Sequence, residues 1–509
     1  MELAPSRVAA PPSRRWLGFP KGAWLIIGVE FWERFSFYGM MSILALFLKA
    51  SPATGGFGWS TSESLGLVGT YTFAMYAFPA VGGYLADRVL GRRRAVKLGA
   101  SFMFVGQALL ASPALLPEIL GRAHGVPLLA ALRDLGVPLG RWVGSPQIQA
   151  AILRQGPLLD AHAGAGWLTQ AYAASTLGFF CAIFCLVLGN ALMKSTLVVL
   201  CGETMDPTDP HREAAFAYYY LGISLGALLS GFLVGIAAQT FGWYLGFTVG
   251  AVGMGVALGA YLTLSGRWLG EIGRNPERTA ARAASSVAQP RQEALRRVLL
   301  LFVLALLLCA FSIGWFQLYG SWLLFIDEHV DRALGRFTIP TPWFTSINAG
   351  FVIPLAPVLA ALWVWLGERN RSLDIVQKYI FALSMVTLAN GLFYLAARYA
   401  VPPVQASVWL PIASLALLGA GELVAWTSTY GMVSRAAPVG FASVAMGGWY
   451  LLTLGLGGYL SGFAGELVDA FGFAHAFLSI GAFTGFACIV AVCLRGPLAR
   501  LAARARVSL

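Results

Sequence analysis

Long apolar runs recur along the whole chain. We count twelve that are long enough to cross a bilayer, which takes about 17 to 25 apolar residues in a helix. Of the 509 residues, 58% are hydrophobic and only 11% are charged, a composition that excludes a soluble globular protein. The sequence therefore predicts an all-α membrane protein with twelve transmembrane helices. The runs lie at roughly 22–48, 63–86, 96–115, 169–200, 214–238, 244–265, 298–325, 344–366, 378–397, 406–430, 442–464 and 473–494.

Basic residues between these runs indicate the topology. If the N-terminus is cytosolic, most of the 35 Lys and Arg residues fall on the cytosolic side, as the positive-inside rule requires. Topology therefore explains the net charge of +12, and we expect no nucleic-acid partner. The sequence predicts a multi-pass protein of the cell membrane with both termini cytosolic, and we expect it to be a monomer.

Two polar segments interrupt the series of apolar runs. Residues 267–297 are basic, rich in Ala and Ser and too polar to cross the bilayer, so they predict a cytosolic linker between two six-helix bundles. Residues 116–168 predict an external insertion, whose Leu- and Ala-rich pieces suit short helices at the membrane surface. The other predicted parts are a cytosolic N-terminus at 1–21, an N-terminal bundle at 22–266, a C-terminal bundle at 298–494 and a basic cytosolic tail at 495–509.

Ionisable residues stand inside the first and fourth runs. Glu30, Glu33 and Arg34 fall at i, i+3 and i+4, with Tyr38 at i+8, on one face of a helix. A charge at the bilayer centre costs roughly 2.5 to 3.5 kcal/mol on insertion scales, so such groups are usually functional. Two acids beside one base suit a group that gains and loses a proton, and a purely structural ion cluster is the alternative. Lys194 needs a carboxylate partner, for which Glu30 or Glu33 is the obvious candidate.

Patterns that would indicate an enzyme are missing from the sequence. The six cysteines contain no C-x-x-C pair, and the five histidines show no metal-ligand spacing. We also find no pairing of a nucleophile with a general base. We therefore expect neither catalysis nor a metal site, and no cofactor other than the proton as a coupling ion.

Several motifs resemble those of the proton-dependent oligopeptide transporters, a branch of the major facilitator superfamily. The first is Glu30-x-x-Glu33-Arg34-Phe, followed by aromatic-Tyr38-Gly. The fifth run resembles the second signature of this family with Ser224 in place of Asn, and Met-Gly-Gly-Trp449 resembles a Met-Gly-x-Trp motif. The resemblance implies the major facilitator fold of two six-helix halves. The loop after the second run resembles the superfamily's gating loop through Gly83, Asp87, Arg88, Gly91 and Arg92.

The resemblance also implies a function, namely proton-coupled import of di- and tripeptides by alternating access. A short peptide would place its carboxylate against Arg34 and Lys194 and its amino group against Glu422 and Asn348. Proton coupling would involve Glu30, Glu33 and Lys194. The candidate substrate-binding residues are Arg34, Tyr38, Tyr76, Lys194, Ser224, Trp315, Asn348, Glu422, Trp426 and Trp449.

One departure and several alternatives accompany this reading. Phe316 stands where the family usually has a glutamate, which puts part of the usual coupling or gating in question. Lys49 and Asp327 end the first and seventh runs and suggest an external latch, although Asp327 is equally well explained as a solvated surface acid. Other open functions are transport of an amino acid, nitrate or a peptide-like metabolite, export, and a non-transporting receptor or scaffold.

Overall fold

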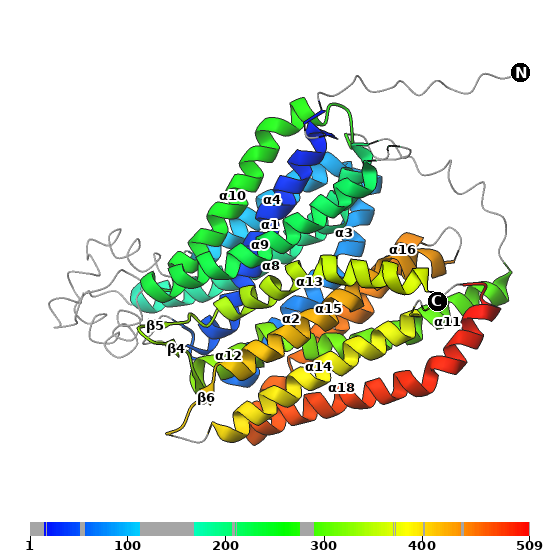
Figure 1. The fold of residues 1–509 in the computed structure, drawn as a ribbon. Helices are drawn as coiled ribbons and strands as arrows, with labels where there is room; N and C mark the ends of the chain where they lie inside the picture. Colours follow the sequence, from blue (N-terminus) through cyan, green and yellow to red (C-terminus); the bar gives the residue numbers. More distant parts are fainter. Residues whose placement is uncertain are drawn as a thin grey trace, which may run out of the picture.

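The structure is a computed structural model that is almost entirely helical (Figure 1). It describes residues 15–16, 18–50, 56–111, 167–205, 209, 211–274, 290–369, 371, 373–400, 403–438 and 442–507. Residues 116–166 of the predicted external insertion and residues 275–289 of the predicted linker lie outside these residues. The helices are α1 (Lys21–Lys49), α2 (Thr61–Ala77), α3 (Pro79–Leu85), η2 (Ala86–Leu90), α4 (Arg92–Ala111), α8 (Trp167–Glu203), α9 (Arg212–Phe241), α10 (Trp243–Trp268), α11 (Arg291–Trp315), η5 (Phe316–Tyr319), α12 (Ser321–His329), α13 (Trp343–Glu368), α14 (Ile375–Tyr399), α15 (Trp409–Ala436), α16 (Ala442–Tyr450), η6 (Leu451–Gly455), α17 (Leu456–Ser461) and α18 (Ala464–Arg504).

The helices follow the predicted apolar runs. In the described part of the chain, nine helical segments are long and apolar enough to cross a membrane. The other three predicted spans coincide with α1, α4 and the continuous segment α16–η6–α17. In α1, the ionisable residues lower the mean hydropathy of a helix that is otherwise apolar. Gly472 interrupts α18 with φ 79°, a backbone conformation that favours glycine, and so separates the last two predicted spans.

Helix α18 continues beyond the last predicted span, through Pro497 to Arg504, into the predicted basic tail at 495–509. Arg297 of α11 donates hydrogen bonds to the carbonyl oxygens of Ala505, at 3.1 Å, and Ala437, at 3.3 Å. These contacts join the end of α18 to α11 and to the end of α15.

The helices form two groups, and each group is held together by contacts among its own helices. In the N-terminal group (α1–α10), α1 packs against α9 and α10, and α4 packs against α8 and α10. In the C-terminal group (α11–α18), α14 packs against α15 and α18. Three short two-stranded pairings are present in the described residues: β1–β2 (Arg15–Trp16, Phe19–Pro20), β3–β6 (Val330–Asp331, Ala406–Ser407) and β4–β5 (Ala333–Leu334, Phe337–Thr338). The two helix groups converge near β3–β6 and β4–β5 and diverge toward the C-terminus (Figure 1).

Contacts between the two groups gather at the end that carries Lys49, Ser62 and Glu328, which the sequence predicts to be external. The backbone N–H of Ser62 donates to Asp469 Oδ2 at 2.7 Å. The indole N–H of Trp343 donates to the carbonyl oxygen of Phe232 at 3.1 Å. These bonds join α2 to α18 and α9 to α13. The predicted external end is therefore closed in this structure.

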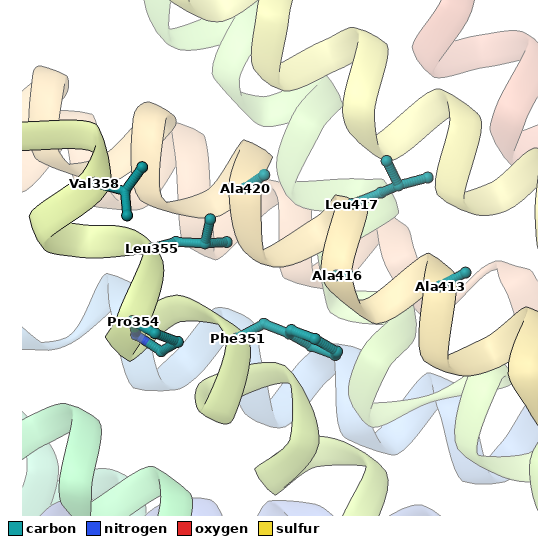
Figure 2. A pocket seen from close by; sticks show the side chains of 8 residues that line it. All are labelled: Phe351, Pro354, Leu355, Val358, Ala413, Ala416, Leu417 and Ala420. Carbon is teal, nitrogen blue, oxygen red and sulfur yellow. The ribbon is translucent and has the colours of Figure 1, made fainter. Parts of the chain in front are cut away.

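An apolar groove lies between α13 and α15 (Figure 2). From residue 353 onward, α13 buries none of its side chains. A long unburied apolar surface is suited to contact with lipid in a membrane-spanning helix. The groove contains none of the predicted binding residues, so it is separate from the candidate site. It is lined by Phe351, Pro354, Leu355, Val358, Ala413, Ala416, Leu417 and Ala420.

Candidate functional site

Glu30, Glu33 and Arg34 form one buried cluster on α1, as their spacing predicts. Their exposed fractions are 5%, 1% and 4%. Arg34 donates to Glu33 through both Nε and Nη2, with 2.7 Å between Nη2 and Oε1. Its Nε also lies 3.4 Å from Oε1 of Glu30. The planar guanidinium thus forms a bidentate ion pair with Glu33 and also contacts the carboxylate of Glu30.

Two polar residues that the sequence analysis did not single out connect this cluster to neighbouring helices. Tyr219 of α9 donates its hydroxyl to Glu30 Oε2 at 2.7 Å. Asn190 of α8 accepts from Arg34 Nη2 at 3.5 Å and donates to the carbonyl oxygen of Met75 at 2.7 Å. Polar side chains inside apolar runs were the available signal for both residues. The cluster is therefore held by α1, α2, α8 and α9 together.

The direct contact that the structure shows for Lys194 is with an aromatic ring. Its Nζ lies 3.7 Å from the centroid of the Tyr76 ring, a cation–π contact. Among the described residues, Lys194 forms no direct ion pair with Glu30 or Glu33, both of which contact Arg34, although both carboxylates attract its ammonium group. The sequence-based prediction of a carboxylate partner is therefore met by electrostatic attraction and not by a salt bridge.

The second charged centre lies in the C-terminal group. Glu422 of α15 accepts two hydrogen bonds on Oε2, from Trp315 Nε1 at 2.9 Å and from Asn348 Nδ2 at 3.0 Å. These donors belong to α11 and α13, so three helices meet at this carboxylate. Asn348 Oδ1 is buried and has no hydrogen-bond partner among the described residues. Trp426 packs edge-on against Trp315, with 6.2 Å between ring centroids.

Five aromatic side chains connect the two charged centres. Tyr38 stacks on Tyr319 at 6.1 Å between ring centroids. Tyr76 meets the edge of Phe316 at 6.3 Å, and Phe316 meets Trp315 at 4.8 Å. The guanidinium of Arg34 lies 5.9 Å from the Tyr38 ring. We call Tyr38, Tyr76, Trp315, Phe316 and Tyr319 the central aromatic cluster.

Two predicted binding residues are not connected to these groups by the described contacts. The hydroxyl of Ser224 donates to the carbonyl oxygen of Tyr220 on its own helix at 3.2 Å. Trp449 is buried in α16, and its Nε1 has no hydrogen-bond partner among the described residues. Their assignment to substrate binding therefore stays a prediction.

The loop motif forms a joint between helices. Arg92 donates from Nε to Asp87 Oδ1 at 2.9 Å and pairs with Glu203 at the end of α8. Gly91 has φ 77°, which allows the chain to turn between η2 and α4. A Cβ at Gly83 would lie 2.8 Å from Ser195 Oγ, so the glycine permits close packing of α3 on α8. Arg88 lies over the Tyr84 ring, 5.8 Å from its centroid.

The predicted latch is wrong by one residue. Lys49 Nζ lies 2.6 Å from Oε1 of Glu328, the neighbour of Asp327. Asp327 instead accepts from Thr341 Oγ1 at 2.7 Å and lies 3.4 Å from Arg332 Nη2. Consecutive helical side chains point about 100° apart, so only one of two adjacent acids can face α1. The structure therefore contains the ion pair between the two helix groups, with a different acid.

Comparisons with known proteins agree with this architecture. The chain matches the sequence profile of the POT family over residues 93–285 and 276–481. It is 26% identical over 520 residues to the peptide transporter YePEPT of Yersinia enterocolitica subsp. palearctica serotype O:3 (strain YE-P4), with 90% of each chain covered. It is 23% identical over 488 residues to dipeptide and tripeptide permease A of Escherichia coli (strain K12), covering 87% of this chain and 84% of that one. A solved POT family transporter in complex with 5-aminolevulinic acid is 20% identical, with a TM-score of 0.77 over 96% of this chain and 98% of that one.

Proposed function

Since this chain belongs to the POT family, whose members are transporters rather than enzymes, we propose that it is a proton-coupled symporter that imports di- and tripeptides by alternating access. The observation that carries the proposal is the division of charge between the two helix groups. Glu30, Glu33, Arg34 and Lys194 lie in the N-terminal group, Glu422 lies in the C-terminal group, and the central aromatic cluster connects them. A zwitterion is the solute that complements such a pair of centres.

The polar atoms that are left over indicate how a peptide would lie. The ammonium group of Lys194 rests on a ring rather than on a carboxylate, so it is available to the peptide's carboxylate together with Arg34. Asn348 Oδ1 lacks a hydrogen-bond partner among the described residues and lies on the residue that donates to Glu422. Asn348 Oδ1 and the carboxylate of Glu422 therefore both suit the peptide's amino group as acceptors, since charge-assisted hydrogen bonds are roughly twice as strong as neutral ones.

Competition for Arg34 provides the coupling. While Glu33 is ionised, its carboxylate engages two nitrogen atoms of the guanidinium. Protonation of Glu33, or of Glu30, which contacts the same guanidinium, weakens the pairing and frees Arg34 for the carboxylate of the substrate. Proton and peptide then favour the same state of the protein, which is the thermodynamic requirement for symport.

Alternating access follows from the closed end. The contacts between the two helix groups at the predicted external end support a state that opens toward the cytosol. Rocking of the groups about the central site would open the other side. We further propose a monomer in the cell membrane, with both termini cytosolic and the proton as its coupling ion.

A second candidate is transport of another small zwitterion. The similar transporter solved with 5-aminolevulinic acid holds a solute with one amino group and one carboxylate. The two charged centres of this chain would recognise the same two groups.

Proton entry into proteoliposomes tests the proposal. Vesicles loaded with a pH-sensitive dye and held inside-negative receive dialanine and a set of other di- and tripeptides from outside, with Glu33→Gln and Glu422→Gln beside the parent. Glu271→Gln is the matched control, because its exposed carboxylate pairs only locally with Arg274 at 2.6 Å in the described contacts. We expect acidification in the parent and the control, and its loss in the other two variants. Absence of acidification with any di- or tripeptide, from folded protein, would overturn the proposal.

A further inference from the structure

We propose that the site selects peptides with apolar or aromatic side chains and discriminates against peptides with cationic side chains. This inference rests on the proposed peptide transport and adds the class of side chain that the site accepts. It is carried by the position of Phe316 and by the partners of the three glutamates at the site.

Phe316 lies between the two charged centres. It is only 6% exposed, and its ring contacts Tyr76 on one side and Trp315 on the other. Tyr76 carries the ammonium group of Lys194, whereas Trp315 donates to Glu422. A zwitterion whose ends meet Lys194 and Glu422 must therefore pass its side chains along this aromatic surface.

The described part of the site offers no spare carboxylate for a second cation. Glu33 pairs with Arg34, and Glu30 contacts Arg34 and Tyr219. The remaining acid, Glu422, is assigned to the amino group of the peptide.

Two of the five rings in the central aromatic cluster already face a cation. Tyr38 and Tyr76 already face Arg34 and Lys194, and a further cation there would be repelled by both. An unpaired charge is costly away from water, whereas aromatic rings pack favourably against one another.

Equilibrium binding to the purified full-length protein tests the inference. Alanyl-phenylalanine, dialanine and alanyl-lysine are titrated into the parent, Phe316→Leu and Phe316→Glu. We expect the parent to bind alanyl-lysine at least about tenfold more weakly than alanyl-phenylalanine, since tenfold corresponds to the loss of a single good contact. Phe316→Leu removes the ring, so the affinity for alanyl-phenylalanine should exceed the affinity for dialanine by a smaller factor than in the parent. Phe316→Glu supplies a counter-ion, so this variant should bind alanyl-lysine more tightly than alanyl-phenylalanine, the reverse of the parent.

The outcomes separate this inference from the proposed function. If the parent binds alanyl-lysine as tightly as alanyl-phenylalanine, the inference is overturned while peptide binding stands. If no peptide binds, the proposed function fails and the inference fails with it. If Phe316→Glu does not fold, the parent and Phe316→Leu still test the inference. An affinity ratio of alanyl-phenylalanine to dialanine that is the same in Phe316→Leu as in the parent overturns the role given to Phe316.

Discussion

The hydroxyl of Tyr219 donates a hydrogen bond to Oε2 of Glu30, with 2.7 Å between the two oxygen atoms. The contact joins α9 to α1 and lies beside the ion pairs of Arg34. Donation to a carboxylate favours its ionised form. Tyr219 therefore connects Glu30 to helix α9, which also contacts α13 across the two helix groups.

Tyr219→Phe should change the pH dependence of uptake. The ionised carboxylate of Glu30 loses a donor, so protonation becomes easier and half-maximal peptide uptake should move to higher pH. A hydrogen bond to a charged group contributes about 1.5 to 3 kcal/mol, which corresponds to about 1 to 2 pH units. Tyr379→Phe is the matched control, because its buried hydroxyl contacts Thr429 in the C-terminal group. An unchanged profile in Tyr219→Phe would contradict this role.

Neutralising the ion pair of Lys49 and Glu328 should loosen the predicted external end. Both side chains are partly exposed, at 24% and 36%, so the pair contributes about 0.2 to 1 kcal/mol. Lys49→Gln and Glu328→Gln should each speed deuterium uptake in residues 321–329, measured by mass spectrometry. The charge swap Lys49→Glu with Glu328→Lys should restore slow exchange. A swap that exchanges as fast as the single variants would show that the pair does not hold this end closed.

A side chain at Gly231 should prevent α9 from meeting α13. A Cβ at this position would lie 2.3 Å from Ser346 Oγ and 2.8 Å from Thr345 Oγ1. Overpacking of this kind costs about 1 to 3 kcal/mol, so Gly231→Val should slow uptake by at least about tenfold through loss of the closed state. Gly259→Val is the control, because no atom lies within 4 Å of a Cβ there. Equal uptake rates in the two variants would refute the importance of this contact.

Local patterns were the reliable part of the sequence analysis. The helical spacing of Glu30, Glu33 and Arg34 predicts a common face, and they form one cluster because their contacts lie within a single helix. The apolar runs likewise predict the helices, since each span needs a minimum apolar length. Motifs supplied Asn348 and Glu422, which the structure brings together.

Contacts between helices could not be predicted in the same way. The partners of Lys49 and Lys194 depend on how each helix is rotated, and a shift of one residue turns a side chain by about 100°. Sequence therefore suggested Asp327 and a glutamate, whereas the structure has Glu328 and the ring of Tyr76. The hydrogen bond from Tyr219 to Glu30 was missed for the same reason.

Binding of terminally blocked peptides tests the central claim most directly. Dialanine, its N-acetyl form and its C-terminal amide are titrated into the parent and Glu422→Gln. If Glu422 receives the amino group, N-acetylation should weaken binding to the parent by at least about tenfold and have little further effect in Glu422→Gln, while amidation should weaken binding to both proteins. Two outcomes would contradict the account. In one, N-acetylation weakens binding to Glu422→Gln by the same factor as binding to the parent. In the other, the parent binds all three peptides with equal affinity.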